Sequence, residues 1–366
     1  MSRVLVGAFA LAAILGAVIL ADRYGGDFLR RSEAPRETRV TALVGGEKLA
    51  FLANPRVVAH LQEAHGIVLD ARKAGSIEMV MGPPGEGIDA LWPSNEIAVE
   101  LFLAHGGRVV GDTLIFNSPL VFYTWRPVLD ALQDAGIAQA LGNSAHAVDT
   151  AALIQLVLSG RAWSEIGVEG LYGPVTVQST NPSKSNSGNM FAGLVANMLA
   201  GGGVADVAAI EAHSAEITAL FEALGHMERS SGDIFRKYLD MGLGAKPLIV
   251  GYENQLVEVY IAEERYRDFI EREVTVLYPK PTVWAPHPLI ALNEKGSRLA
   301  AALLDPAIQE IAWAEHGFRS GLTAGAEAPQ IAALPGIPER IESVIGLPSP
   351  AAMAQIIALI DPMPGD

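Results

Sequence analysis

Strand-like and helix-like segments alternate along most of this chain, with short turn signals between them. Lys48–Leu52 has the pattern of a strand, and Asn54–Pro55 then begins a helix that ends at Gly66. Ile67–Asp70 returns as a strand, and the alternation continues through the buried strand predicted at Leu248–Gly251 to a helix that begins at Asp305–Pro306 and ends at Gly317. Strands that alternate with helices over short connections are typical of parallel sheets covered by helices. The sequence therefore predicts an α/β fold.

The chain is long and apolar enough to form more than one core. Hydrophobic residues make up 50% of its 366 residues and charged residues 18%, so extended disorder is not expected. The part that follows residue 46 contains 320 residues (366 − 46). Because one hydrophobic core seldom organises so long a segment, we expect two lobes.

The first residues determine the expected compartment. Val4–Ala21 contains 18 residues without a charge, and about 17–25 apolar residues are enough to cross a bilayer. The apolar region of a signal peptide is shorter, about 7–15 residues, although Ile19–Ala21 also resembles a cleavage site. We therefore expect residues 1–22 to form a signal anchor in the cell membrane or, alternatively, a cleaved signal peptide. In either case the body of the protein would lie in the periplasm or outside the cell.

Charge and missing motifs exclude several classes of function. The net charge of −15, with no basic stripe, argues against nucleic-acid binding. The chain has no cysteine, which removes a lipid-modified N-terminus and a disulfide framework. Its histidines show no metal-ligand spacing, and His60 and His65 lie five residues apart on a predicted helix. No nucleophile elbow, zinc-protease motif or Walker loop occurs. We expect no cofactor and no catalysis, and an enzyme is the least favoured alternative.

A strand, a polar turn and a helix follow one another at Val175–Phe191. The β-branched run Val175–Val177 leads into the turn Ser179–Gly188, which holds five hydroxyl side chains, and a helical apolar pattern begins at Phe191. The start of a helix carries unpaired N–H groups and partial positive charge, so it favours an anion or another oxygen-rich ligand. The alternative is a loop that only caps its own helix.

Several short segments, taken in order, resemble one protein family. They are Asn54–Pro55, Asn117–Val121, Tyr172–Pro174, Ser179–Pro182, Ser185–Gly188, Gly251–Gln255, Tyr278–Pro279 and Gln309–Arg319. This ordered set resembles the bacterial extracellular solute-binding proteins of the type II periplasmic-binding fold, which is related to receptors for molybdate, sulfate and phosphate. The resemblance extends from about Lys48 to Arg319.

The resemblance implies a two-lobed α/β fold, preceded by the N-terminal segment, whose lobes close on a ligand. The hinge would lie near Phe122–Arg126 and Gly251–Glu253, because hinge motions absorb backbone changes at the ends of elements. The expected parts are a tether at 23–46, lobe 1 at 47–125 and 277–322, lobe 2 with the crossovers at 126–276, and a C-terminal helical extension at 323–366.

The resemblance also implies a set of ligand-binding side chains and backbone groups in the cleft. These are Asn54, Ser118, Ser183, Ser185, Asn186, Ser187, Gly188, Tyr252 and Glu253. Structural roles compete at several of them, because Asn54 is also a standard helix cap and Ser118 precedes a turn proline. Tyr252 and Glu253 would equally suit a hinge hydrogen bond, and a buried Glu253 would need a partner.

The chain is thus expected to be an extracytoplasmic solute-binding protein that captures a small oxygen-rich, anionic ligand between two lobes. The expected partners are that ligand, a permease of an ABC-type transporter, and the membrane through the N-terminal helix. Because a receptor anchored without a lipid-attachment cysteine is unusual, a membrane-tethered sensor or scaffold with a receptor-like fold is the alternative.

Overall fold

The computed structural model describes residues 36–142, 144–320, 331, 334, 336–338 and 340–360. Its strands are β1 (Thr38–Val44), β2 (Ile67–Lys73), β3 (Ala90–Trp92), β4 (Gly111–Trp125), β5 (Ala138–Gly142), β6 (Ala145–Asp149), β7 (Leu248–Tyr252), β8 (Val274–Lys280) and β9 (Trp284–Ala291). Its α-helices are α2 (Leu49–Ala53), α3 (Pro55–His65), α4 (Glu96–Ala104), α5 (Arg126–Asp134), α6 (Thr150–Leu158), α7 (Asn186–Leu199), α8 (Val207–Ala212), α9 (Ser214–Glu222), α10 (Ser231–Met241), α11 (Glu253–Ala262), α12 (Arg267–Glu273), α13 (Glu294–Leu303), α14 (Pro306–His316) and α16 (Pro350–Ile360). Short 3₁₀ turns are η1 (Gly46–Lys48), η2 (Glu78–Val80), η3 (Trp163–Ile166) and η4 (Glu264–Tyr266).

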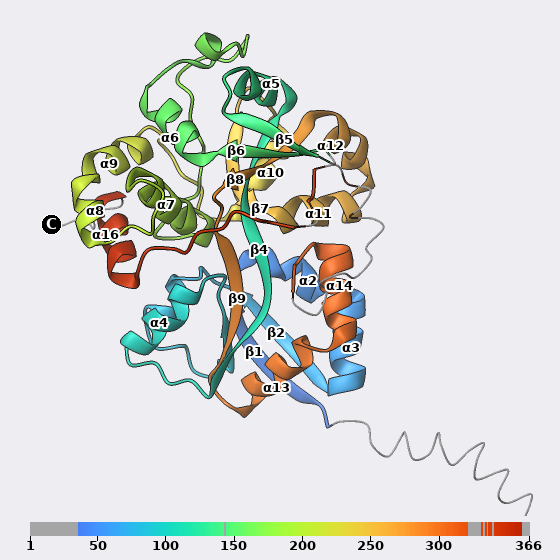
Figure 1. Ribbon diagram of the computed structural model, residues 1–366. Helices are drawn as coiled ribbons and strands as arrows, with labels where there is room; N and C mark the ends of the chain where they lie inside the picture. The colour runs from blue at the N-terminus through green and yellow to red at the C-terminus, as the bar shows by residue number, and fades with distance from the viewer. Residues whose placement is uncertain are drawn as a thin grey trace, which may run out of the picture.

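The long strand β4 connects two halves of the molecule, which we call lobe 1 and lobe 2 (Figure 1). The strand order is β2-β1-β3-β9-β4-β8-β6-β5, and β7 also pairs with β4. The first part of β4, Gly111–Pro119, pairs with β9 of lobe 1. Its second part, Leu120–Trp125, pairs with β7 and β8 of lobe 2. The change of partners between Pro119 and Leu120 therefore marks where the chain passes from one lobe to the other.

Lobe 1 is built around β1, which pairs in parallel with both β2 and β3. Val40, Ala42 and Val44 alternate along β1 and are completely buried, as expected of a strand with one face on a core. Asn54 caps α3 through the N–H of Arg56, and Gly66 ends that helix in the left-handed conformation. These local signals confirm the predicted start and end of α3.

Lobe 2 has its own cores on the two faces of its strands. Its longest helix, α7, is buried along nearly its whole length, and Figure 1 shows α7 among the helices on one side of the lobe. Strand β8 pairs in parallel with β6 but antiparallel with β4. The predicted α/β class is therefore confirmed, but the strand pairing is mixed, because β4 and β9 run against their neighbours.

One boundary and one strand predicted near the start of the chain are wrong. The tether expected at residues 23–46 extends too far, because Thr38–Val44 is a strand of lobe 1 that pairs with β2 and β3. The strand expected at Lys48–Leu52 is instead η1 followed by the helix α2, which buries Phe51 and Leu52. A short apolar run fits a strand and a buried helix equally well, and β1 already occupies the place in the sheet.

The boundary predicted between the lobes also needs correction. Residues 120–125 were expected in lobe 1 but pair with lobe 2 strands, and so does the segment 277–280 of β8. The hinge expected at Phe122–Arg126 consequently lies inside a paired strand and at the start of α5. The chain passes between the lobes a few residues earlier, between Pro119 and Leu120, where the partners of β4 change from β9 to β7 and β8.

In the predicted C-terminal extension, α16 packs against α7, α8 and α9 of lobe 2. The contact is close at Gly193 of α7, where a Cβ atom would lie 2.9 Å from Leu347 and 3.1 Å from Met353. Asn197 of the same helix donates a hydrogen bond of 2.8 Å to the carbonyl of Gly346. Within the described residues, none of the helices has the length and apolar character of a membrane span. The predicted anchor at residues 1–22 lies outside the described residues.

Candidate functional site

A polar cavity of about 220 Å³ lies between the two lobes. One wall comes from lobe 1 and consists of the turn after β1 and the segment after β2. The other wall comes from lobe 2 and consists of the starts of α7 and α10, with Tyr252 at the end of β7. The lining residues are Gly45, Gly46, Glu47, Lys73, Ala74, Gly75, Ser76, Glu78, Lys184, Ser185, Asn186, Arg229, Ser230, Ser231, Asp233 and Tyr252.

The lobe 2 wall presents the N-terminal ends of two helices. Ser185 is the N-cap of α7 and Ser230 is the N-cap of α10, and both have extended backbone angles. Neither side chain forms the usual capping hydrogen bond to its own helix. The first N–H groups of a helix have no partner within it, and the helix dipole adds partial positive charge there. Both helix ends can therefore donate hydrogen bonds to a ligand.

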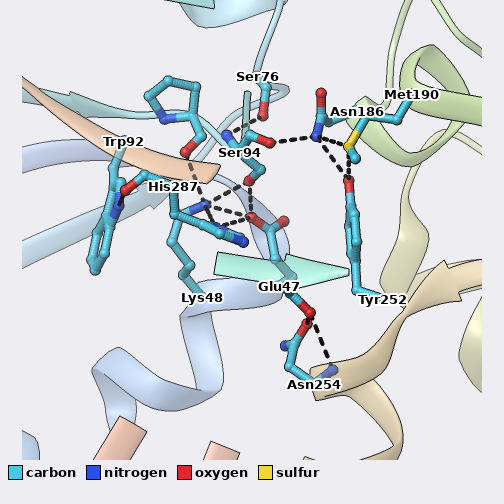
Figure 2. Close-up of polar contacts among 12 residues, drawn as sticks. Glu47, Lys48, Ser76, Trp92, Ser94, Asn186, Met190, Tyr252, Asn254 and His287 are labelled. Atoms are coloured by element: carbon cyan, nitrogen blue, oxygen red, sulfur yellow. Dashed lines mark hydrogen bonds and ion pairs between the residues drawn. The ribbon is translucent and has the colours of Figure 1, made fainter. Parts of the chain in front are cut away.

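The lobe 1 wall presents a charge that is held by a buried network (Figure 2). The side chain of Glu47 is 7% exposed and forms an ion pair with Lys48, whose side chain is fully buried. Lys48 Nζ also lies 2.7 Å from Ser94 Oγ and 3.2 Å from His287 Nδ1, and Ser94 donates a hydrogen bond to Glu47. The Glu47 carboxylate is therefore held in place by two buried side chains, Lys48 and Ser94.

The pKa values in this network follow from burial and from the Glu47–Lys48 pair. Burial would raise the pKa of Glu47, but the charge of Lys48 and hydrogen bonds from Lys48 and Ser94 lower it to about 2. Burial lowers the pKa of Lys48, and Glu47 opposes that change. Burial also lowers the pKa of His287 well below its usual value, with Lys48 adding to the effect. Glu47 is therefore ionised and His287 neutral near pH 7.

Five more charged side chains, all exposed, line the cavity. Lys73, Lys184 and Arg229 are cationic, and Glu78 and Asp233 are anionic. None of the three cations forms a salt bridge with a carboxylate in the described part of the chain. Since Lys48 compensates Glu47, the remaining charges leave a balance of one positive (three minus two). The rim of the cavity is weakly cationic.

The two walls touch one another at Asn186, the first residue of α7 (Figure 2). Its side-chain amide donates hydrogen bonds to the carbonyl of Ser94 in lobe 1, at 2.6 Å, and to the hydroxyl of Tyr252 in lobe 2, at 2.9 Å. A Cβ atom on Gly75 of lobe 1 would lie 2.8 Å from the carbonyl oxygen of Lys184. The lobes are consequently closed on each other in this structure.

The predicted loop before α7 divides between the cavity and the interior. Ser185 and Asn186, two of the predicted ligand-binding residues, line the cavity. Ser187 is fully buried behind them, with its hydroxyl 2.8 Å from Thr180 Oγ1 and 3.3 Å from Ser185 Oγ. Ser183 belongs to a local turn, in which its N–H and hydroxyl both bond to the side chain of Asn181.

Gly188, in the first turn of α7, allows the helix to pack tightly against the turn that precedes it. A Cβ atom at this position would lie 2.1 Å from the carbonyl oxygen of Thr180. That distance is far below van der Waals contact, so the backbone approach between the turn and the helix requires glycine. Gly188 thus positions the start of α7 without lining the cavity itself.

Asn54 and Ser118 have structural partners and do not line the cavity. Asn54 caps α3 and also donates a hydrogen bond of 2.7 Å to Glu315 of α14. Ser118 is fully buried in β4, where its hydroxyl donates to Asn254 Oδ1 at 3.1 Å and accepts the Asn254 N–H at 3.3 Å. Ser118 therefore holds the first turn of α11 at the junction between the lobes.

Tyr252 and Glu253 are neighbours with different surroundings. Tyr252 lines the cavity and accepts the hydrogen bond from Asn186. Glu253 is fully buried beside it and forms a bidentate ion pair with Arg319, at 2.6 and 2.9 Å. Tyr278 donates a further hydrogen bond to Glu253 at 2.6 Å. Of the two roles considered for Glu253, these contacts support the one at the junction between the lobes.

Sequence reasoning missed all of the lobe 1 wall and all of the cations in the cavity. Glu47, Lys73, Ser76 and Arg229 carried no recognised motif. One signal was present, because Gly45–Gly46 directly follow an alternating segment and ligands of α/β proteins bind near the carboxyl ends of parallel strands. Reading Thr38–Val44 as a strand would have pointed to Glu47.

Comparisons of sequence identify no relative of this chain. No protein-family model matches it, and no curated protein is similar to it.

Comparison of structures, in contrast, finds similarity over most of the chain. A protein assigned as an extracellular solute-binding protein from Bordetella parapertussis has a TM-score of 0.55 at 12% identity, covering 88% of this chain and 97% of that one. The ferric binding protein from Campylobacter jejuni has a TM-score of 0.55 at 9% identity, covering 87% and 96%. Iron-bound HitA from Pseudomonas aeruginosa has a TM-score of 0.54 at 12% identity, covering 88% and 98%.

These identities are too low to transfer a ligand, but the coverage includes both lobes and the strands between them. The resemblance noted in the sequence is thereby confirmed at the level of the fold. This chain has the two-lobed α/β architecture of the periplasmic solute-binding proteins, the type II periplasmic-binding fold.

Proposed function

We propose that this chain is an extracytoplasmic solute-binding protein that captures a small oxygen-rich, anionic ligand between its lobes. The observation that carries the proposal is the pair of helices α7 and α10, which both begin at the cavity without a side-chain cap. Two sets of unpaired N–H groups that converge on one cavity suit a ligand with several oxygen atoms.

Charge supports a negative ligand in the same cavity. Lys73, Lys184 and Arg229 line it from both lobes, and each has an exposed side chain that can turn toward a bound anion. Glu47 is already compensated by Lys48, so it opposes an anion less than a free carboxylate would. The size of about 220 Å³ suits a small solute better than a peptide or a polymer.

Capture requires the lobes to separate, because both walls contribute to the cavity and touch at Asn186. The motion would occur where β4 changes partners and where the chain returns between β8 and β9. Such hinge closure around a ligand needs large backbone changes at only a few residues. The role is binding and release, without chemistry on the ligand.

The proposed location is outside the cytoplasm, with residues 1–22 as a single anchor in the cell membrane. A captured solute would then pass to the permease of an ABC-type transporter. N-terminal sequencing of the native protein tests the anchor. A mature chain that begins at Asp22 would show a secreted protein and leave the binding proposal standing.

A ligand screen tests the binding proposal directly. Inorganic oxyanions, small carboxylates, amino acids and sugars are added to the soluble body while its melting temperature is followed, because a ligand of the native state raises stability. We expect an anion to give the largest increase. If no anion stabilises the protein, or a neutral sugar does so best, the anionic ligand is wrong, and a sensor or scaffold becomes the better description.

Two adjacent basic residues, Lys73 and Arg72, provide a test of anion binding and its matched control. Lys73 lines the cavity, whereas Arg72 beside it pairs with Asp70 outside it. A hydrogen bond to a charged partner contributes about 1.5–3 kcal/mol, so Lys73→Gln should weaken binding about tenfold or more in titration calorimetry. Arg72→Gln should bind like the wild type. Equal affinities of the two variants would place the ligand elsewhere.

A further inference from the structure

Two imidazoles and a carboxylate meet in lobe 1, away from the cavity between the lobes. His60 and His65 belong to α3, and Asp305 is the N-cap of α14. One ligand atom from each lies within 4.8 Å of the others. The Nε2 atoms of His60 and His65 are each 3.1 Å from the same atom, Asp305 Oδ2. None of the three residues lines the cavity between the lobes.

We propose that His60, His65 and Asp305 form a binding site for a first-row divalent metal ion of the zinc type. Imidazole nitrogen and carboxylate oxygen are both ordinary zinc ligands, with bonds of about 2.0–2.2 Å. Ligand atoms around a tetrahedral ion with such bonds lie roughly 3.3 Å apart, which is close to the 3.1 Å measured here. Three protein ligands leave the fourth position to water.

Hydrogen bonding alone does not satisfy the cluster. His65 Nε2 has hydrogen-bond geometry toward Asp305 Oδ2. His60 Nε2 lies at the same distance from that oxygen, yet it is buried and has no well-aligned hydrogen-bond partner among the described residues. For His60, this arrangement fits a lone pair that points at an ion, with the neighbouring carboxylate off its axis. A buried nitrogen without a partner is otherwise unfavourable.

The carboxylate is already oriented for a ligand. Asp305 Oδ1 accepts the N–H of Ala307 at 2.9 Å, which fixes the group and leaves Oδ2 facing the two histidines. Partners of this kind orient metal ligands in proteins. The three side chains are between 25% and 29% exposed, so an ion and its water can enter from solvent.

The spacing of these residues in the sequence does not indicate a metal site. A spacing of five residues does not place two histidines on one face of a regular helix, since neighbours there lie three or four residues apart. His65 is the last residue of α3, and its ring lies 5.5 Å from that of His60. Asp305 is 240 residues away from His65 in the sequence. An ion bound to all three would hold α3 against α14.

Titration calorimetry with Zn²⁺ alone, on tag-free protein pretreated with a chelator, tests the site. We expect one ion per chain and a higher melting temperature. His60→Gln and Asp305→Asn, which retains a capping side chain, should each weaken Zn²⁺ binding at least about tenfold, the lower limit seen when even a supporting partner is lost. His213→Gln, which changes a histidine that has Glu216 but no third ligand beside it among the described residues, should bind like the wild type.

Absence of Zn²⁺ binding by the wild type would overturn the proposal, and so would equal binding by all variants. A second measurement keeps the test decisive if a variant does not fold. Co²⁺ in a site of low coordination number absorbs visible light, and Zn²⁺ should displace it from the wild type with loss of colour. A Co²⁺ spectrum that remains that of the hydrated ion would also overturn the site. Neither result bears on the ligand proposed between the lobes.

Discussion

The two walls of the cavity present polar groups in different ways, because lobe 2 uses helix ends and lobe 1 uses a buried ion pair. Lobe 2 presents helix ends, α7 and α10, whose N-caps leave the first N–H groups available. Lobe 1 presents a single ionised carboxylate, Glu47, supported by the buried Lys48 and by Ser94. A helix end is neutral overall and needs no buried counterion, whereas a buried charge is tolerated only with its partner present.

This difference shows how each wall should respond to change. The lobe 2 wall depends on backbone geometry, so it is sensitive to added bulk but not to loss of a single charge. The lobe 1 wall depends on one ion pair, so removal of one partner should affect the whole fold. Four predictions test this comparison.

The largest effect is expected from Lys48→Met. The substitution leaves Glu47 almost fully buried without its cation, and loss of one partner of a buried pair costs about 3–5 kcal/mol. Urea denaturation at pH 7 measures the change in the free energy of unfolding. The double variant Glu47→Gln, Lys48→Met should recover most of the loss. A single variant as stable as the wild type would show that Glu47 does not depend on Lys48.

Acid should remove the same contribution from the wild type. The pKa of Glu47 in the folded protein is about 2, below its ordinary value of 4.5, so the stabilisation is complete above pH 4.5. It is lost as the pH falls through this range toward 2, and the shift corresponds to about 3 kcal/mol. Urea titrations at several pH values should show a shallower decline for the double variant. Parallel declines in the two proteins would contradict this assignment.

Gly188→Ala should be the more harmful of two similar changes in lobe 2. Its new Cβ would lie 2.1 Å from the Thr180 carbonyl oxygen, and overpacking of this kind costs about 1–3 kcal/mol. Gly232→Ala is the control, because its nearest neighbour would lie 3.7 Å away and alanine favours a helix. Thermal unfolding should separate the two. Equal melting temperatures would mean that the turn before α7 adjusts freely.

The smallest effect concerns Ser187, which lies behind the cavity, and Ser185, which lines it. Ser187→Ala should lower stability by about 1 kcal/mol through the lost bond to Thr180 and leave ligand affinity unchanged. Ser185→Ala should lower the affinity for the ligand identified in the screen. Calorimetry on both folded variants distinguishes these roles. Weaker binding by Ser187→Ala would show that its hydroxyl reaches the ligand after all.

The parts of the fold that sequence predicted well are those controlled by local signals. Asn54, Pro55 and Gly66 bound α3 because a cap, a fixed φ angle and a left-handed residue act within one turn. The start of α7 was predicted less well, because its first turn, Asn186–Gly188, was assigned to the preceding polar turn. The run Lys48–Leu52 failed because its pattern fits two structures, and the choice depends on β1 occupying the sheet.

The candidate site was predicted only where it is local. Ser185 and Asn186 were found because they lie at the start of a helix that the sequence itself indicates, and Tyr252 because it ends a predicted strand. Lys73 and Arg229 come from different lobes, and no spacing rule relates residues that meet only after two lobes close. Glu253 was correctly expected to need a partner, but Arg319 could not be inferred from the residues around it.

The contact between α16 and α7 has a consequence for how the protein matures. Gly193 and Asn197 of α7 are covered by Leu347, Met353 and the Gly346 carbonyl, which follow far later in the chain. Contacts between segments so distant in sequence form late, because a long loop must first be closed. The helix α7, which begins at the cavity, therefore gains its full packing late. Lobe 1 depends on late residues as well, because β9 pairs with both β3 and β4, so neither lobe is complete until most of the chain has been made.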